Sequence, residues 1–224
     1  MATLNQKELL GLLLRAIDAS GWKTIILSES KPFRFRVFQN DEKGFTICVY
    51  IWNCTHGGGK ARAKDEYRVQ LTGVVPNITI GELTLLLGWH EGYGVFVAFD
   101  INKHVGQVSQ SPSIQVKESS LSDAHQHAFA IYLRHNGEIA VVFRPEFFVD
   151  YALNAPSLHM TGQIEEELTL LNTLDTLTDD KISTVSDTER RSIISKISRK
   201  YRAQDFRRRI LGAYGHRCAM CTSN

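Results

Sequence analysis

The sequence has no long hydrophobic run. Its longest apolar segments, Ile47–Trp52 and Ile139–Phe143 among them, are only as long as β-strands, whereas a membrane-spanning helix needs about 20 apolar residues. Proline is sparse and glycine is at its average frequency, with 5 and 16 residues in 224, which excludes a collagen-like or low-complexity chain. Because 43% of the residues are apolar, we expect one buried core of roughly 150 to 200 residues and no association with a membrane.

Cysteine is also scarce, with four residues at positions 48, 54, 218 and 221. Residues 1–16 contain Lys and Glu and have helical periodicity, so they do not resemble a secretory signal peptide. Four cysteines without such a signal argue against a disulfide framework. We therefore expect a protein of the reducing cytoplasm.

Neither sign of charge dominates the whole chain, since 26 Lys and Arg stand against 24 Asp and Glu. The net charge nevertheless differs strongly between three segments of the chain. Residues 1–149 hold 15 basic and 14 acidic side chains, residues 150–188 hold 1 and 8, and residues 189–224 hold 10 and 2. We therefore expect an acidic spacer followed by a basic tail that binds an anionic partner, nucleic acid first.

Hydrophobic periodicity predicts an α+β fold. Apolar residues at helical spacing predict a helix over 4–19, and the capping-box pair Thr79 and Glu82 favours another over 80–87. Further helices are expected over 121–130 and 146–153. Alternating or short apolar runs predict six strands, at 33–38, 45–52, 66–74, 95–99, 113–116 and 138–143. The sheet should be mixed, mainly antiparallel and flanked by helices.

The composition divides the chain into three parts. Residues 1–155 should form the folded domain, and residues 156–186, rich in Thr, Asp, Glu and Leu, an acidic linker. Residues 187–224 are basic, with helices expected over 188–200 and 203–213.

The end of the chain carries a pair of cysteines with zinc-binding spacing. Cys218 and Cys221 are separated by two residues, as in a zinc knuckle, where two thiolates hold one ion through a tight turn. Four-coordinate zinc needs two more ligands, and none follows in the sequence. The pair is therefore either half of an incomplete zinc site or a CxxC without metal.

A basic helix that leads into Ala-Tyr-Gly-His-Arg-Cys-Ala-Met-Cys resembles the entry to an HNH (ββα-metal) nuclease domain, over residues 201–221. The resemblance implies that a general-base histidine and a second ligand pair follow, and these are missing here. We therefore expect a fragment or truncated chain that does not cut DNA, and we assign no catalytic residue. Arg207 and Arg208 of the basic helix are candidates for binding DNA.

Four segments of the longer domain, residues 56–70, 97–100, 113–116 and 140–148, resemble domains that precede HNH nucleases in bacterial restriction-type proteins. The resemblance implies recognition of double-stranded DNA, in some relatives DNA with a modified base. The leading hypothesis is the specificity region of an HNH restriction endonuclease whose catalytic core is absent from this chain.

The residues themselves favour a DNA site in the loop and strand over 53–73. Gly58 lies in a run of three glycines whose backbone N–H groups can approach a phosphate. Arg68 and Gln70 share one face of the following strand, where such side chains can bond guanine and adenine. A flexible hairpin loop beside a solvated strand is the alternative. The side chains expected to surround the glycines with positive charge are His56, Lys60, Arg62 and Lys64.

A second hypothesis is a Mg²⁺-dependent nuclease of the PD-(D/E)xK type around residues 65–104. Asp65 and Glu66 would hold the metal, but Arg68 stands where a lysine is expected, and Asp100 and Lys103 have the wrong spacing. The carboxylates could instead hold a neighbouring arginine in place. A third hypothesis is non-enzymatic, an interaction module whose basic tail docks an acidic partner.

Two aromatic pairs are candidates for stacking on a flipped base: Tyr50 with Trp52, and Trp89 with Tyr93. Aromatic residues at strand spacing also commonly belong to a core. Both interpretations are open at this point.

Overall fold

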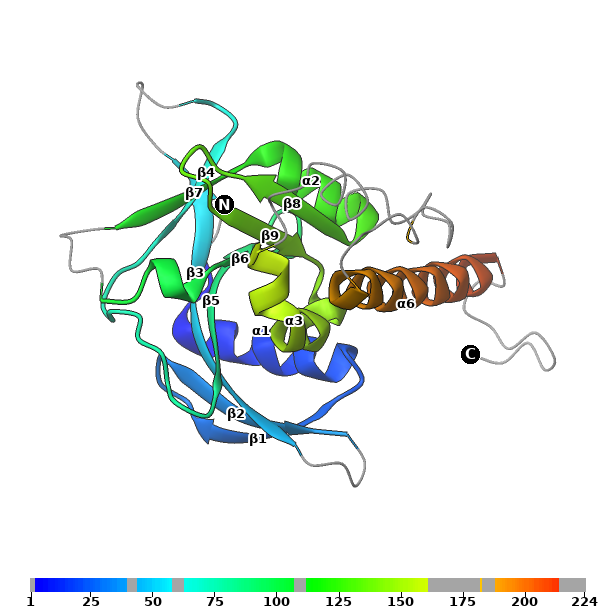
Figure 1. The fold of residues 1–224 in the computed structure, drawn as a ribbon, viewed down its shortest axis with the longest axis horizontal. Coiled ribbons are helices and arrows are strands. Elements are labelled where there is room, and N and C mark those ends of the chain that lie inside the picture. Colours follow the sequence, from blue (N-terminus) through cyan, green and yellow to red (C-terminus); the bar gives the residue numbers. More distant parts are fainter. Residues whose placement is uncertain are drawn as a thin grey trace.

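The fold is taken from a computed structural model, which describes residues 3–39, 44–57, 63–106, 112–160, 182 and 188–213. Within these ranges it has the α+β fold expected, a mostly antiparallel mixed sheet with helices around it (Figure 1). The strands are β1 (Lys23–Ser28), β2 (Phe33–Phe38), β3 (Phe45–His56), β4 (Glu66–Gln70), β5 (Leu83–His90), β6 (Val95–Phe99), β7 (Ser113–Lys117), β8 (Phe129–Leu133) and β9 (Ile139–Phe143). The helices are α1 (Gln6–Ala19), α2 (Glu118–His127), α3 (Phe148–Met160) and α6 (Thr188–Ala213), with 3₁₀ turns η1 (Ile101–Lys103) and η2 (Pro145–Phe147).

The main sheet has the strand order β1-β2-β3-β5-β6-β9-β8. Its neighbours are antiparallel except β3 and β5, which run parallel. β4 leaves this path, because it pairs with the last three residues of β3 and, on its other side, with β7. We call these two strands, residues 66–70 and 113–117, the β4–β7 ribbon.

One face of the main sheet packs against α1 and α3. α1 begins with a capping box between Asn5 and Glu8, and its apolar side, including Leu13 and Ile17, joins a core with Phe35 of β2. Burying each such side chain contributes about 1.5 to 3 kcal/mol to folding. The first half of α6 enters the same core through Ile193, Ile194, Ile197 and Tyr201.

The opposite face is covered by the β4–β7 ribbon and α2. The inward side chains of the ribbon form a second core with Leu86, Val97 and Leu121. Contact between β4 and β5 is close at Gly88, where a Cβ atom would lie 2.2 Å from Cγ2 of Val69. The ribbon residues in this core are Tyr67, Val69, Ile114 and Val116.

The predicted helix over 80–87 is wrong, since residues 83–90 form β5. Glu82 does not cap a helix, because its carboxylate bonds the guanidinium of Arg34, with Nε at 3.0 Å from Oε2. The run Leu83–His90 is buried on both faces from Leu85 onward, and a short apolar run of this kind fits a buried strand as well as a helix.

The helix predicted over 121–130 begins and ends earlier. α2 stops at His127 because Ala128 adopts a φ of 72°, and the following residues form β8, which the sequence did not predict. β1 was likewise missed. Its exposed positions Ile25 and Leu27 lack the alternation that marks a half-buried strand.

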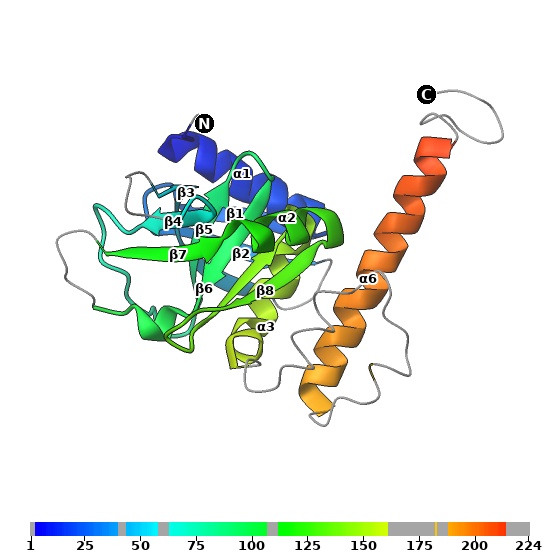
Figure 2. The same cartoon turned by 90° about the horizontal axis from the view of Figure 1, so that it is seen from above.

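The two helices predicted over 188–200 and 203–213 form the single helix α6. The residues at the predicted break, Lys200 to Ala203, include neither proline nor glycine, so nothing in this stretch ends the helix. α3 runs to Met160, past the predicted boundary at 155, and most of the predicted linker lies outside the described residues. Figure 2 shows the second half of α6 projecting from the body, at the end away from the β4–β7 ribbon. None of the helices described is long and apolar enough to span a membrane.

Candidate nucleic-acid interface

The β4–β7 ribbon alternates buried and partly exposed residues on both strands. Its inward side belongs to the second core, so its outward side carries all the charged and amide side chains of the two strands. The antiparallel register aligns Glu66 with Lys117, Arg68 with Gln115, and Gln70 with Ser113. The outer face is therefore an array of hydrogen-bonding side chains in a fixed register on two paired strands.

Arg68 and Gln70 share this outer face, as their spacing predicts. Arg68 lies between Thr55 of β3 and Gln115 of β7. Its Nε atom is shielded from solvent and has no hydrogen-bond partner among the described residues. A donor in that condition is costly to leave unpaired, but because it is shielded it is not the group that meets a ligand. Arg68 is a binding candidate because its side chain lies on the outer face, directly across from Gln115.

The loop before β4 is described only at its two ends. His56 Nε2 lies 2.8 Å from the carbonyl oxygen of Lys64, and Gly57 N–H donates to the Glu66 carbonyl at 3.0 Å. These bonds close the base of the loop beside the ribbon, with Lys64 exposed. Three predicted site residues, Gly58, Lys60 and Arg62, lie outside the described residues.

Of the predicted residues near the C-terminus, Arg207 is described with its side chain. Arg207 is exposed on the projecting half of α6. Arg208 belongs to the same helix, but its side chain lies outside the described part, as do Cys218 and Cys221. Figures 1 and 2 place α6 and the ribbon at opposite ends, so among the described residues Arg207 and the ribbon belong to two separate surfaces.

A pocket of about 160 Å³ opens beside the outer face of the ribbon, where β7 meets the turn between β8 and β9. Glu66, Gln115 and Lys117 form its ribbon side. Tyr132, Arg134 and His135 line the other side.

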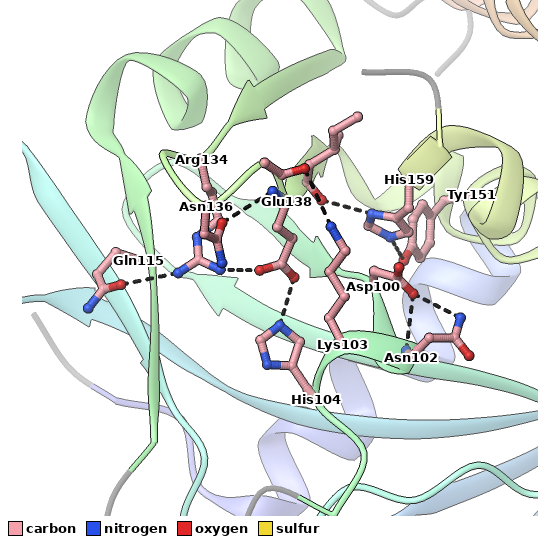
Figure 3. Close-up of polar contacts among 12 residues, drawn as sticks. Asp100, Asn102, Lys103, His104, Gln115, Arg134, Asn136, Glu138, Tyr151 and His159 are labelled. Atoms are coloured by element: carbon pink, nitrogen blue, oxygen red, sulfur yellow. Dashed lines mark hydrogen bonds and ion pairs between the residues drawn. The ribbon is translucent and has the colours of Figure 1, made fainter. Parts of the chain in front are cut away.

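A buried charged network supports this pocket. The Glu138 carboxylate is fully buried and bonds His104 Nε2 at 2.7 Å and the Arg134 guanidinium (Figure 3). Burial raises the pKa of Glu138, but the bonds and charges of His104 and Arg134 outweigh burial, so the pKa lies below its usual value. Arg134 Nη2 also donates to Gln115 Oε1 at 3.3 Å. The network thus links a buried carboxylate to the outer face of the ribbon.

Sequence reasoning missed Gln115, Arg134 and Glu138 as site residues. The signal available was the turn Asn136-Gly137, where Gly137 has a φ of 75°, because a tight hairpin brings the flanking residues 134 and 138 together. Gln115 is distant in sequence, and only the packing of β7 against this turn reveals its contact with Arg134.

The residues of the Mg²⁺ hypothesis have other partners. Asp65 accepts a hydrogen bond from Lys117 Nζ at 2.7 Å, and Asp100 accepts one from the Asn102 backbone at 3.0 Å. Lys103 lies 3.4 Å from the carbonyl oxygen of Gly137. Within the described ranges, no three His, Cys, Asp or Glu residues gather as a metal site would require.

The aromatic pairs are mostly core. Tyr50 and Trp52 are buried and stacked, with ring centroids 6.3 Å apart, and Trp52 Nε1 donates to the Thr72 carbonyl at 2.9 Å. Trp89 and Tyr93 pack against different cores on opposite faces of the sheet. The structure does not form either pair into an open stacking pocket.

An aromatic cluster anchors the start of β4 to the main sheet. His90 is fully buried, with its ring centroid 4.8 Å from Tyr67 and 5.0 Å from Tyr93. Its Nδ1 accepts from the Tyr93 backbone N–H at 3.0 Å, and burial lowers the His90 pKa, so the ring is held neutral. Both tyrosine hydroxyls donate to Glu118, Tyr93 at 2.9 Å and Tyr67 at 3.4 Å. The cluster fixes the position of the ribbon.

A second pocket, of about 170 Å³, lies between β5, η1 and α3. The Tyr151 hydroxyl and His159 Nε2 are 2.9 Å apart, and His159 Nδ1 lies 2.9 Å from the Ile139 carbonyl oxygen. Because Nδ1–H must donate to that carbonyl, Nε2 accepts from Tyr151. Burial raises the Tyr151 pKa and lowers the His159 pKa, so both groups are neutral and bonded to each other.

No curated protein and no solved structure matches the chain. One family model does match, over residues 45–152, which run from the start of β3 into α3 and include the entire β4–β7 ribbon. This region, just under half of the chain, is similar to the family described as Methylase-associated X1.

Proposed function

We propose that the chain is a DNA-recognition module of a restriction–modification system, and that the outer face of the β4–β7 ribbon contacts double-stranded DNA. The observation that carries this proposal is the outward array of polar side chains on the ribbon, in which Arg68 lies between Thr55 and Gln115. The match of residues 45–152 to a methylase-associated family supports it. Restriction and modification enzymes act on the same DNA sequences, so a domain associated with methylases fits a specificity role.

The charge around the ribbon fits a site that reads hydrogen bonds more than one that attracts phosphate. Lys64, Arg68 and Lys117 are accompanied by Asp65 and Glu66, so cations exceed carboxylates by one. The stronger positive charge lies on α6. We propose that α6 makes sequence-independent phosphate contacts, Arg207 and Arg208 among them, and that the residues after it open an HNH nuclease domain, with Cys218 and Cys221 as half of its zinc site.

The test is binding of the full chain to a fluorescent 20-base-pair duplex, measured by anisotropy from 50 to 200 mM NaCl. We expect an affinity that falls steeply with salt, because released counterions drive phosphate binding. Arg68→Gln should weaken binding several-fold. Arg36→Gln, which removes an exposed arginine from β2 at a distance from the ribbon, should not.

Duplexes with methylated cytosine or methylated adenine, compared with the unmodified duplex, test whether recognition depends on modification. Absence of binding to every duplex at 50 mM NaCl would overturn the proposal and favour an interaction module with a protein partner. Binding that Arg68→Gln and Arg36→Gln weaken equally would remove the ribbon from the interface.

A further inference from the structure

The orientation of the Gln115 amide is fixed by its neighbour. A guanidinium has only N–H donors, so the Gln115 atom that faces Arg134 must be the carbonyl oxygen, Oε1. Arg134 is itself held by the buried Glu138 carboxylate. A Gln115 amide turned by 180° would place its –NH₂ group against the Arg134 guanidinium. An N–H of the nearly buried Arg134 would then lose its acceptor, which is unfavourable.

The Gln115 nitrogen, Nε2, therefore faces away from Arg134, as Figure 3 shows. Among the residues that the structure describes, it has no hydrogen-bond partner. Arg68 lies directly across the ribbon from Gln115, and opposed side chains on one face have Cβ atoms about 4.5 to 5.5 Å apart. Gln115 and Arg68 together present N–H donors to the same patch, and neither offers an acceptor there.

A glutamine that is free to turn bonds adenine through both its oxygen and its nitrogen. Gln115 cannot do so while Arg134 holds its oxygen. Guanine presents two adjacent acceptors, O6 and N7, in the major groove, whereas adenine presents one acceptor and one donor. The donor-only pair is complementary to guanine and mismatched to adenine.

We propose that Arg68 and Gln115 select guanine in duplex DNA, and that Arg134 and Glu138 act as positioning residues that fix the Gln115 amide with its nitrogen outward. This inference rests on the proposed function. Phosphate oxygens are also acceptors, so the test must separate base from backbone.

The experiment selects preferred duplexes for the full chain from a randomised pool and compares guanine with adenine at the most constrained position. We expect guanine to be preferred by roughly 5- to 100-fold, the range of one good bidentate contact. Replacing that guanine by 7-deazaguanine, which removes N7 and leaves every phosphate in place, should abolish most of the preference.

Gln115→Glu tests the orientation. The glutamate can still accept from Arg134 with one oxygen, but its other oxygen faces outward as an acceptor, so most of the preference for guanine should be lost. Gln126→Glu on α2, where Gln126 is exposed, adds the same charge away from the ribbon and should leave the preference unchanged. Arg134→Lys keeps the positive charge beside Glu138 but lacks the planar fork of donors that holds Glu138 and Gln115 in fixed directions, so selectivity should fall while salt-dependent binding persists.

The outcomes separate this inference from the proposed function. Salt-dependent binding with equal affinity for guanine and adenine, or with no effect of 7-deazaguanine, overturns the inference and leaves DNA binding intact. A preference for adenine also overturns it, because the amide oxygen would then face the base. No binding to any duplex overturns both. If Arg134→Lys fails to fold, the exposed-face variant Gln115→Glu and 7-deazaguanine decide the question alone.

Discussion

Lys31 shows how a single side chain can work against the stability of the fold. Its ammonium group lies 4.1 Å from the centroid of the Trp52 ring, and no carboxylate within the described ranges forms an ion pair with it. Burial lowers the Lys31 pKa from 10.5 to about 8. The aromatic ring compensates only part of the lost hydration, so the charged form is disfavoured in the folded state.

We predict that Lys31→Met stabilises the protein at pH 7 and that this gain shrinks between pH 8 and pH 10. Below pH 8 both the folded and the unfolded states carry the proton, and the cost of burying the charge is fully present. Between the folded pKa of about 8 and the unfolded pKa of 10.5, the unfolded state binds more protons, so wild-type stability from this group rises with pH. Urea unfolding of both proteins at pH 7, 8, 9 and 10 measures the difference.

Lys7→Met, at an exposed position of α1, controls for loss of a positive charge. A Lys31→Met difference that stays constant from pH 7 to pH 10 would contradict the prediction.

Among individual residues, the sequence correctly predicted the relative placement of those that are close together in the chain. Arg68 and Gln70 are two apart in one strand, so alternation alone places them on one face. Gln115 is 47 residues from Arg68, and its partner Arg134 belongs to a different hairpin. The alternation of residues along one strand does not tell which strand lies beside it, nor which buried charged group bonds its side chains. The contact between Gln115 and Arg134 therefore could not be predicted from the sequence.

At the scale of elements, strands with clear alternation or short apolar runs were predicted, while β1, β5 and β8 were not. β5 was predicted as a helix because Thr79 and Glu82 have the spacing of a capping box. In the structure the Glu82 carboxylate instead accepts a hydrogen bond from Arg34 on β2. β8 follows Ala128, whose φ of 72° is rare for a residue with a Cβ atom. For β5 and β8, a tertiary contact or an unusual backbone angle overrides the local signal, whereas the exposed strand β1 lacks the alternation that would have predicted it.

The packing of β4 on β5 depends on the absence of a side chain at Gly88. We predict that Gly88→Ala destabilises the protein by about 1 to 3 kcal/mol, the usual cost of overpacking a core. The added Cβ would lie 2.2 Å from Val69 Cγ2 and 3.3 Å from Cys54 Cβ, and Val69 is fully buried. Urea unfolding gives the free energy, and amide exchange should increase in β4 and β7 before other strands.

Gly11→Ala is the matched control. Gly11 lies inside α1, and its added Cβ would meet only Arg15 Nη1 at 3.4 Å, so the change should stabilise the protein by about 0.5 to 1 kcal/mol. The double variant Gly88→Ala with Val69→Ala should recover part of the stability lost in Gly88→Ala. An unchanged stability for Gly88→Ala would show that β4 is not packed on β5 as described.

At the scale of the whole molecule, two surfaces of different character lie at opposite ends (Figures 1 and 2). The β4–β7 ribbon offers directional hydrogen bonds with nearly balanced charge. α6 belongs to the segment with 10 basic and 2 acidic residues, and its described core residues, from Ile193 to Tyr201, lie in or next to its first half. Its exposed Arg207 carries charge, and Arg209 is partly neutralised by Asp205 at 2.8 Å.

We predict that the two surfaces contribute additively to DNA binding. Arg207→Gln should lower affinity for all duplexes by a similar factor and reduce the salt slope by about 0.9, because one phosphate contact is lost. Gln115→Glu should change the preference between guanine and adenine without that uniform loss of slope. Sites this far apart share no partners, so the double variant should show the sum of the two effects within about 0.5 kcal/mol. A larger deviation in anisotropy titrations on a 30-base-pair duplex would mean that DNA binding couples α6 to the ribbon.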